Sequence, residues 1–279
     1  MTVAEFTAIV GGGALVAGFL GSLTGLGGGV VIVPLLTIGL GVDIRYAIGA
    51  SLVSVIATSS GAAAAYVREG YSNIRAGMFL EIATSAGALS GAFVATLLAP
   101  KVIAIIFGGV LIYSAYLSFT KAAEDPVETG PPDRLAAWLR MDSSYPTRSG
   151  QVSYRVRNVP VGFLLMAIAG VLSGLLGIGS GALKVIAMDR AMKLPFKVST
   201  TTSNFMIGVT AAASAGVYFG RGYVDPGIAM PVMLGVLAGA FLGAHILAAA
   251  RSHVLRIAFA VVIFALGIQM IYNGLAGRI

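Results

Sequence analysis

The sequence predicts an all-α polytopic membrane protein that contains two inverted repeats. Three observations lead to this fold class: strong apolarity, an internal duplication, and glycine-rich breaks at the same place in each copy. Of the 279 residues, 57% are hydrophobic and 10% are charged, whereas a soluble domain has roughly 25% charged residues. Several apolar stretches approach or exceed the ~20 residues that a helix needs to cross a bilayer. Because backbone in lipid must satisfy its own hydrogen bonds, these stretches are predicted to be helices.

The duplication divides the chain into two halves. Shifted by 152 residues, positions 17–118 align with 169–270 without a gap, and 24 of the 102 aligned positions are identical. Many of the identities are glycines, whose backbone freedom matters where geometry is demanding. We therefore expect a first transmembrane repeat at 1–120, a linker at 121–158 and a second transmembrane repeat at 159–279.

Each half contains five apolar segments. They lie at about 5–24, 28–41, 47–67, 76–98 and 101–119, and again at about 159–176, 180–192, 199–219, 227–249 and 253–273. The linker between them is polar and rich in proline, which is typical of a flexible connection. Within it, Leu135, Trp138 and Leu139 fit one face of a short amphipathic turn. That turn is either an interfacial anchor, since Trp favours this depth, or an ordinary loop.

The first two segments of each half are predicted to form a helical hairpin with a glycine-rich tip. The first tip reads Gly25-Leu26-Gly27-Gly28-Gly29, and the second reads Gly177-Ile178-Gly179-Ser180-Gly181. Unwound backbone at membrane depth is tolerated only where it is buried in protein or lines a cavity. Each repeat is thus expected to be one glycine-broken hairpin followed by three transmembrane helices. The spacings Gly87-x-x-x-Gly91 and Gly239-x-x-x-Gly243 instead predict close helix packing.

The distribution of Lys and Arg favours inverted over parallel halves. With hairpins, one side of the membrane carries thirteen flanking basic residues, and the other carries only Arg45, Lys101, Arg221 and Arg278. Four continuous spans in each half would give a weaker bias, of ten against seven. The positive-inside rule therefore predicts a cytoplasmic linker and termini on the outside of the cell (inner) membrane.

The tips carry the predicted chemistry. A helix that begins at a tip leaves unpaired N–H groups and a partial positive charge there, which suits an anion. In inverted repeats the two tips meet near the midplane, where transporters hold substrate. Lys184 follows the second tip within an apolar segment, and a charge at that depth is a candidate functional residue. Its repeat mate is Ile32, so this charge occurs in one half only. The alternatives are that the glycines only allow packing and that Lys184 extends to an interface.

Hydroxyl and amide side chains complete the predicted site. A run of six hydrogen-bonding residues, 199–204, opens the third segment of the second half, and its members Thr202, Ser203 and Asn204 could bind substrate oxygens. Ser51 and Thr58 match Ser203 and Thr210 across the duplication. Helix capping or helix–helix hydrogen bonds are the alternative roles. The substrate-binding set is Gly25, Gly27, Gly28, Gly29, Ser51, Thr58, Gly177, Gly179, Ser180, Gly181, Lys184, Thr202, Ser203, Asn204 and Thr210.

Glu81 and His245 are weaker candidates for proton coupling, because each also stands near an arginine that marks an interface. No metal site, catalytic centre or cofactor is predicted. The chain has no cysteine, no His/Asp/Glu cluster with ligand spacing and no phosphate-binding loop. The net charge of +7 fits cytoplasmic loops better than nucleic-acid binding.

The duplicated motif resembles the sulfite exporter TauE/SafE family. It reads Gly18-x-x-x-Ser22-Leu23-Thr24-Gly25-x-Gly27-Gly28-Gly29-x-x-x-x-Pro34, with a copy at Gly170-x-x-x-Gly174-Leu175-Leu176-Gly177-x-Gly179-Ser180-Gly181. The likeness covers both halves and implies a permease for small sulfur-containing or carboxylated anions. The second copy departs from the motif at two positions: Ser180 stands where the first copy has Gly28, and Ile186 stands where it has Pro34. These departures suggest that the second tip sets the selectivity for the anion.

Together these observations predict a secondary transporter that works by alternating access. The expected partners are a small anion such as sulfite, a sulfonate or sulfoacetate, a proton, and the lipid bilayer. Export is the direction that the resemblance favours. The alternatives are a passive anion channel and a transporter of small carboxylates. The sequence predicts neither the anion nor the oligomeric state.

Overall fold

The computed structural model describes residues 2–24, 29–68, 70–119, 133–147, 150–247 and 252–279. Within these ranges the chain forms eleven α-helices, two short π-helical segments and one two-stranded sheet. Three helices there are long and apolar enough to cross a membrane: Ile74–Leu97, Pro100–Leu117 and Val159–Leu176. Shorter apolar helices accompany them, among them Ala4–Leu20, Gly29–Gly39 and Ile44–Ser60. The apolar composition thus yields helices, as predicted.

The duplication reappears in the bounds of the elements. The first half consists of α1 (Val3–Thr24), α2 (Gly29–Pro34), η1 (Leu35–Gly39), α3 (Ile44–Arg68), α4 (Ile74–Leu97) and α5 (Pro100–Phe119). The second consists of α7 (Val159–Leu176), α8 (Gly181–Ile186), η2 (Ala187–Ala191), α9 (Phe196–Gly220), α10 (Pro226–Leu247) and α11 (Ser252–Leu275). The three consecutive elements α2, η1 and α3 begin and end 152 residues before their mates α8, η2 and α9. Both π-helical segments, which the sequence analysis did not foresee, therefore belong to the repeated unit.

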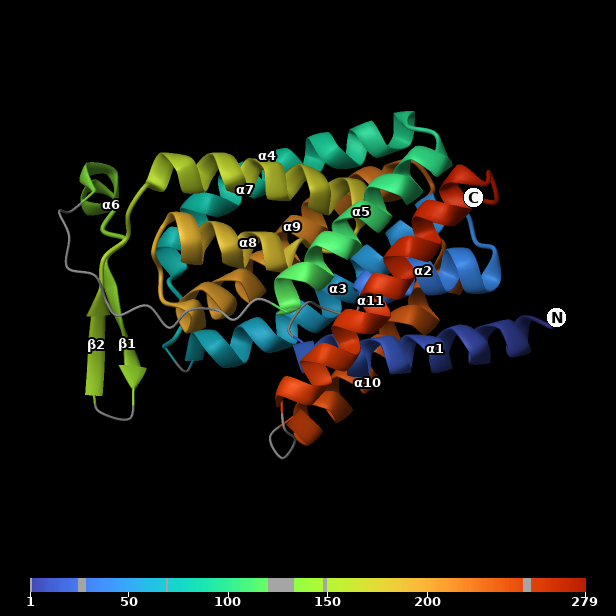
Figure 1. Cartoon of the computed structure of the whole chain (residues 1–279), viewed down its shortest axis with the longest axis horizontal. Helices are drawn as coiled ribbons and strands as arrows, with labels where there is room; N and C mark the ends of the chain where they lie inside the picture. Colours follow the sequence, from blue (N-terminus) through green and yellow to red (C-terminus); the bar gives the residue numbers. More distant parts are fainter. Residues whose placement is uncertain (1, 25–28, 69, 120–132, 148–149, 248–251) are drawn as a thin grey trace.

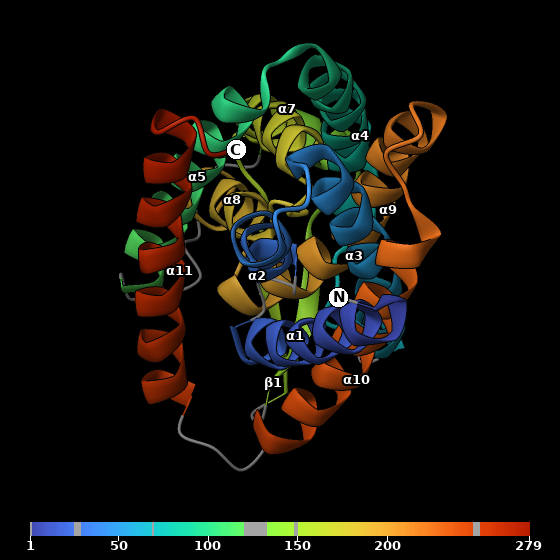
Figure 2. The same ribbon diagram turned by 90° about the vertical axis from the view of Figure 1, so that its right-hand side faces the viewer.

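The main helix pairs join one half to the other. Helix α1 packs against α10, α4 against α7, α5 against α11 and α3 against α9. Figure 2 shows these pairs on four sides of the bundle, with α2 and α8 in the middle. Every residue of α2 is buried. Under the 152-residue repeat α1 corresponds to α7 and α10 to α4, so the α1–α10 and α4–α7 contacts are the same contact made once in each direction.

Glycines permit the closest of these contacts, as their spacing predicted. A Cβ on Gly87 would lie 2.3 Å from the Ala167 carbonyl oxygen, and one on Gly239 would lie 2.0 Å from that of Leu15. These two contacts are themselves 152 residues apart, and no side chain larger than hydrogen fits at either place. A Cβ on Gly91 would likewise lie too close to the Val171 carbonyl oxygen, at 2.1 Å. The surroundings of Gly243 lie outside the described residues.

The described part of the linker is folded, in contrast to the flexible connection that its composition suggested. It forms α6 (Arg134–Trp138) and an antiparallel hairpin of β1 (Ser143–Thr147) and β2 (Gly150–Tyr154), at one end of the bundle (Figure 1). The Asn73 side chain donates to the Met141 carbonyl oxygen at 2.8 Å and to the Tyr154 hydroxyl at 2.9 Å. Burial raises the pKa of Tyr154 and outweighs the opposing hydrogen bonds from Asn73 and Ser143. Tertiary contacts with α4 thus order a polar segment.

Within this linker, Trp138 is 78% exposed, whereas Leu135 and Leu139 are half-buried against neighbouring apolar residues. The three residues therefore do not share one environment. An interfacial role for Trp138 stays a prediction.

Candidate functional site

The second tip is a turn built from left-handed backbone. Helix α7 ends at Leu176 and α8 begins at Gly181, with φ values of +68° at Gly177, +70° at Gly179 and +45° at Ser180. Glycine reaches this region at little cost, whereas a serine there is uncommon. The predicted break in the second half is confirmed, and the departure at Ser180 falls on its most strained residue.

The first tip meets the second. Gly25, Gly27 and Gly28 lie outside the described residues, but α1 ends at Thr24 and α2 begins at Gly29. A Cβ on Gly29 would lie 2.6 Å from Ser51 Oγ and 3.1 Å from the Gly177 carbonyl oxygen. Ser51 Oγ donates to that carbonyl at 2.8 Å. Residues from the two halves that the sequence analysis assigned to one site are therefore in direct contact.

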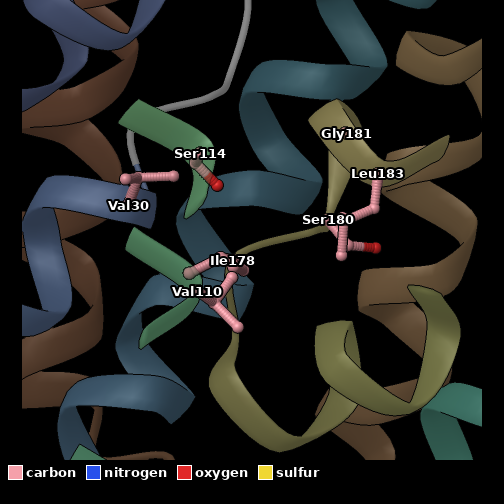
Figure 3. Close-up of a pocket in the computed structure, with 7 residues that line it drawn as sticks. All are labelled: Val30, Val110, Ser114, Ile178, Ser180, Gly181 and Leu183. Carbon is pink, nitrogen blue, oxygen red and sulfur yellow. The ribbon is translucent and has the colours of Figure 1, made fainter. Parts of the chain in front are cut away.

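A small cavity lies beside the tips (Figure 3). On one side are Val30 of α2 and two residues of α5, Val110 and Ser114, and on the other are Ser180 and Leu183. The remaining lining residues are Ile178 and Gly181. The cavity leaves about 10 Å³ for the centre of a water-sized molecule, which is near the minimum for one water. A sulfur oxyanion is larger, so it would need the tips to separate.

Ser180 brings an unused hydroxyl to this cavity. The residue is 4% exposed, and its buried Oγ has no hydrogen-bond partner. Buried polar atoms are normally paired, so this unpaired hydroxyl beside a cavity has room for a hydrogen-bond partner such as a water or a ligand atom. The contributions of Val110 and Ser114 were missed by the sequence analysis. The one available signal was that Ser114 is a hydroxyl residue within an apolar stretch.

Lys184 lies deeper than the cavity lining and is fully buried. Its Nζ donates to Thr210 Oγ1 at 2.6 Å, and Thr210 Oγ1 lies 2.6 Å from Glu81 Oε1, to which it donates. Ser85 Oγ donates to the same carboxylate oxygen at 2.8 Å. Glu81 is thus buried near Lys184. The hydrogen bonds that connect them join α4, which carries Glu81, to α8, which carries Lys184, through Thr210 of α9. The sequence pattern alone does not predict that these two residues are paired.

The remaining predicted residues are divided between the tips and the scaffold. Ser203 Oγ donates to the Gly181 carbonyl oxygen at 3.2 Å, so it lies at the second tip. Thr202 Oγ1 instead accepts from the Asn73 backbone N–H at 2.9 Å, and Thr58 bonds to carbonyls of its own helix. Asn204 is half-buried in α9. His245 is in α10, and its side chain lies outside the described residues.

Among the residues that the structure describes, no three His, Cys, Asp or Glu side chains come together as metal ligands. The polar groups that the structure places at the candidate site are hydroxyls, the backbone at the tips and the Lys184–Glu81 pair.

Apolar helices around a buried polar centre that both halves build define a helical membrane protein. The family model described as "Sulfite exporter TauE/SafE" matches residues 10–270. The chain belongs to this family, which confirms the resemblance seen in the duplicated motif, and it is accordingly a membrane transporter.

Curated relatives match along nearly the whole chain. It is 30% identical to "Probable membrane transporter protein YunE" of Bacillus subtilis (strain 168), over 94% of this chain and 96% of the relative. It is 26% identical to "Probable membrane transporter protein YdhB" of the same organism, over 82% and 84% of the two chains. A "Probable membrane transporter protein" of Xylella fastidiosa (strain 9a5c) is 24% identical over the full length of both chains. No solved structure gives a significant match.

Proposed function

We propose that the protein is a secondary transporter that exports small sulfur-containing anions such as sulfite, sulfonates or sulfoacetate across the cell (inner) membrane. The observation that carries this proposal is the contact between the two glycine tips in the buried middle of the bundle, where Ser51 of one half bonds Gly177 of the other. The family to which the chain belongs supports the sulfur oxyanion as the substrate class.

The proposed anion site consists of the tips and the groups around them. Ser180 and Gly181 would supply hydrogen bonds from the hydroxyl and the backbone of the second tip, and Lys184 would supply a full positive charge. Charge-assisted hydrogen bonds to an oxyanion are about twice as strong as neutral ones, so few donors suffice. The orphan hydroxyl of Ser180 supports this arrangement.

We propose that the halves are inverted and that transport proceeds by rocking one half against the other. The exchange of helix mates between α1–α10 and α4–α7 supports this view, because inverted repeats are related by a two-fold axis. In Figure 1, α1 starts at the labelled N-terminus on the right, whereas its mate α7 starts at the left, beside the hairpin. The bias of basic residues supports a cytoplasmic linker and external termini.

A carrier accounts for the closed centre better than a channel does. The cavity beside the tips is too small for the proposed substrate, and α2 and the Lys184–Glu81 pair are buried on all sides. Admission of an anion therefore requires a conformational change in each cycle. We further propose a proton as the coupling ion, with Glu81 and His245 as the candidate titratable groups.

The test is transport by the purified protein in proteoliposomes. A carrier is expected to saturate with external sulfite and to exchange labelled for unlabelled anion in counterflow. A linear conductance without counterflow would instead establish a channel. Parallel assays with methanesulfonate, sulfoacetate and acetate separate sulfur anions from carboxylates. Transport of acetate alone would overturn the proposed substrate class.

A further inference from the structure

A pair of opposite charges lies in the described interior of the bundle. Among the side chains that the structure describes, Lys184 and Glu81 are the charged groups in the buried class, with 0% and 8% of their surface exposed. They come from different halves, and Thr210 bridges them through two hydrogen bonds of 2.6 Å. A buried charge is tolerated when it is paired in this way. Each of the two residues therefore compensates the other.

The Glu81 carboxylate uses only one of its oxygens. Thr210 and Ser85 both donate to Oε1, whereas Oε2 is buried and has no hydrogen-bond partner. A buried carboxylate oxygen without a donor is costly as an anion and cheaper once protonated. Lys184 is the positive charge that offsets this cost, and Thr210 links it to Oε1 of the same carboxylate.

The duplication supplies an internal comparison. The three positions that correspond to Lys184, Thr210 and Glu81 in the other half are Ile32, Thr58 and Met233. The bridging threonine is thus present twice, but the two charges occur in one of the two related places. At these two related places the charge pair therefore occurs once.

The charge pair adjoins the proposed anion site. Leu183 lines the cavity, and Lys184 is the next residue on the same short helix. Its four-carbon side chain allows the ammonium to change partners without movement of the backbone. An anion held at Ser180 and Gly181 would compete with Glu81 for this ammonium.

We propose that Lys184 is passed from Glu81 to the bound anion, and that Glu81 then takes up on Oε2 the proton that accompanies the anion. The proton comes from the aqueous side to which the site is open, and it leaves when the anion leaves and Lys184 returns to Thr210 and Glu81. The occupied centre then holds a monoanion, an ammonium and a neutral carboxyl group, so its net charge equals that of the empty centre. This inference rests on the proposed function and assigns its coupling residue and its stoichiometry of one proton for each monoanion.

Other described ionisable groups near α4 have their own partners. Helix α7 contains no titratable residue, and α9 presents Thr210 to the carboxylate. Three basic groups approach the ends of α4 or its flanking loop: Arg75 donates to the Arg140 carbonyl oxygen, Arg45 donates to that of Leu98, and Lys197 lies over the Tyr71 ring.

The experiment measures protons taken up when an anion binds to the full-length protein in detergent. Methanesulfonate is the probe, because it stays a monoanion at every pH at which the protein is folded. Its Kd is measured by calorimetry across pH, and proton uptake is followed with an indicator dye in weak buffer. For the native protein we expect one proton bound for each anion and a Kd that rises about tenfold per pH unit over the pH range in which that proton is taken up.

Two variants sharpen the result. Glu81→Gln mimics the neutral carboxyl group, so we expect methanesulfonate to bind without proton uptake and with a Kd independent of pH. The control is Asp43→Asn, which neutralises an exposed acid and should retain the native pH dependence. If Glu81→Gln does not fold, the proton uptake of the native protein on binding methanesulfonate still tests the proposed coupling.

The outcomes separate the two proposals. Binding of methanesulfonate to the native protein without proton uptake would overturn the coupling inference and leave the transport function intact. Proton uptake that survives in Glu81→Gln would overturn the assignment to Glu81. Failure of methanesulfonate, sulfite and sulfoacetate to bind at all would overturn the proposed function and the coupling with it.

Discussion

Lys184 is the residue on which the proposed anion site depends most. Its ammonium is fully buried, and its hydrogen-bond partner is Thr210 Oγ1 at 2.6 Å. Lys184→Ala is expected to abolish the rise in melting temperature that anions cause in detergent, because it removes the full positive charge of the centre. It should also lower stability by about 3–5 kcal/mol, since Glu81 is left buried without compensation.

The measurement is thermal unfolding with and without sulfite, compared within each variant. Lys193→Ala is the matched control, because it removes an exposed lysine of the same segment. Anion stabilisation that persists in Lys184→Ala would remove Lys184 from the binding site.

At the scale of elements, glycine contacts hold the two halves together. A Cβ on Gly170 would lie 2.2 Å from the Thr84 carbonyl oxygen, which is backbone and cannot turn aside. Gly170→Ala should therefore separate α7 from α4 and cost about 1–3 kcal/mol of stability. Gly109→Ala is the control, since nothing lies within 4 Å of a Cβ at that helical position. Thermal unfolding of both variants in the same detergent compares them, and equal stability would contradict this packing role.

The linker is attached to the bundle through Asp133. Its carboxylate accepts from the backbone N–H groups of Leu135 and Ala136 in α6 and from that of Val159 at the start of α7. Desolvation is the largest single influence and raises the pKa of Asp133, but the backbone donors together outweigh it, so the pKa lies below the usual value of 3.8.

This shift fixes the pH range in which the attachment weakens. Because the folded-state pKa is lowered, the stabilisation is fully present above the unfolded value and is lost as pH falls through the folded one. We expect the protection factor of the α6 amides, which is their intrinsic exchange rate divided by the observed rate at the same pH, to be high at neutral pH and to fall in acid below about pH 4. Asp133→Ala should have a low protection factor at both pH values, because removing an N-cap costs about 1 kcal/mol. A high protection factor in that variant would show that the hairpin contacts suffice.

Much of the fold follows from local signals in the sequence. Long apolar runs and the duplication located the helices, and the alternating glycines located the break at Gly177–Gly181. The hairpin of the linker and the Lys184–Glu81 pair were not foreseen, because both depend on tertiary contacts. Tyr154 is placed by Asn73, more than eighty residues away on the chain, and Glu81 meets Lys184 only because α4 packs on α9. A single sequence carries no direct record of such contacts.

At the scale of the whole molecule, two cation–π contacts link the halves at related places. Lys197 Nζ lies 3.7 Å from the centroid of the Tyr71 ring, and Arg45 Cζ lies 5.6 Å from that of Tyr223. Lys197 is the repeat mate of Arg45, and Tyr223 is the mate of Tyr71. Both contacts are formed together in this structure, and in a transporter with inverted repeats we expect a different one of them to break in each of the two open states.

Removing the Tyr71 ring should therefore shift the equilibrium between the two access states in one direction, and removing the Tyr223 ring should shift it in the other. A cation–π contact contributes about 0.5–2 kcal/mol, enough to change the ratio of the states several-fold. The native chain has no cysteine, so Ser180→Cys introduces a single thiol at the cavity. We expect Tyr71→Leu to raise labelling of this thiol by an impermeant maleimide from one side, and Tyr223→Leu to raise it from the other. If Tyr71→Leu and Tyr223→Leu were labelled to the same extent from the same side of the membrane, the two contacts would not close opposite sides.

The exchange of helix mates also governs how the chain must be made. Helix α1 begins at residue 3, but the helix that covers its glycine-rich face begins only at residue 226. During synthesis α1 therefore lacks this packing partner until most of the polypeptide has been made. A product truncated before α10 would leave Gly18 without the Val236 backbone on which it packs, so we expect the first repeat to need the second for its own packing.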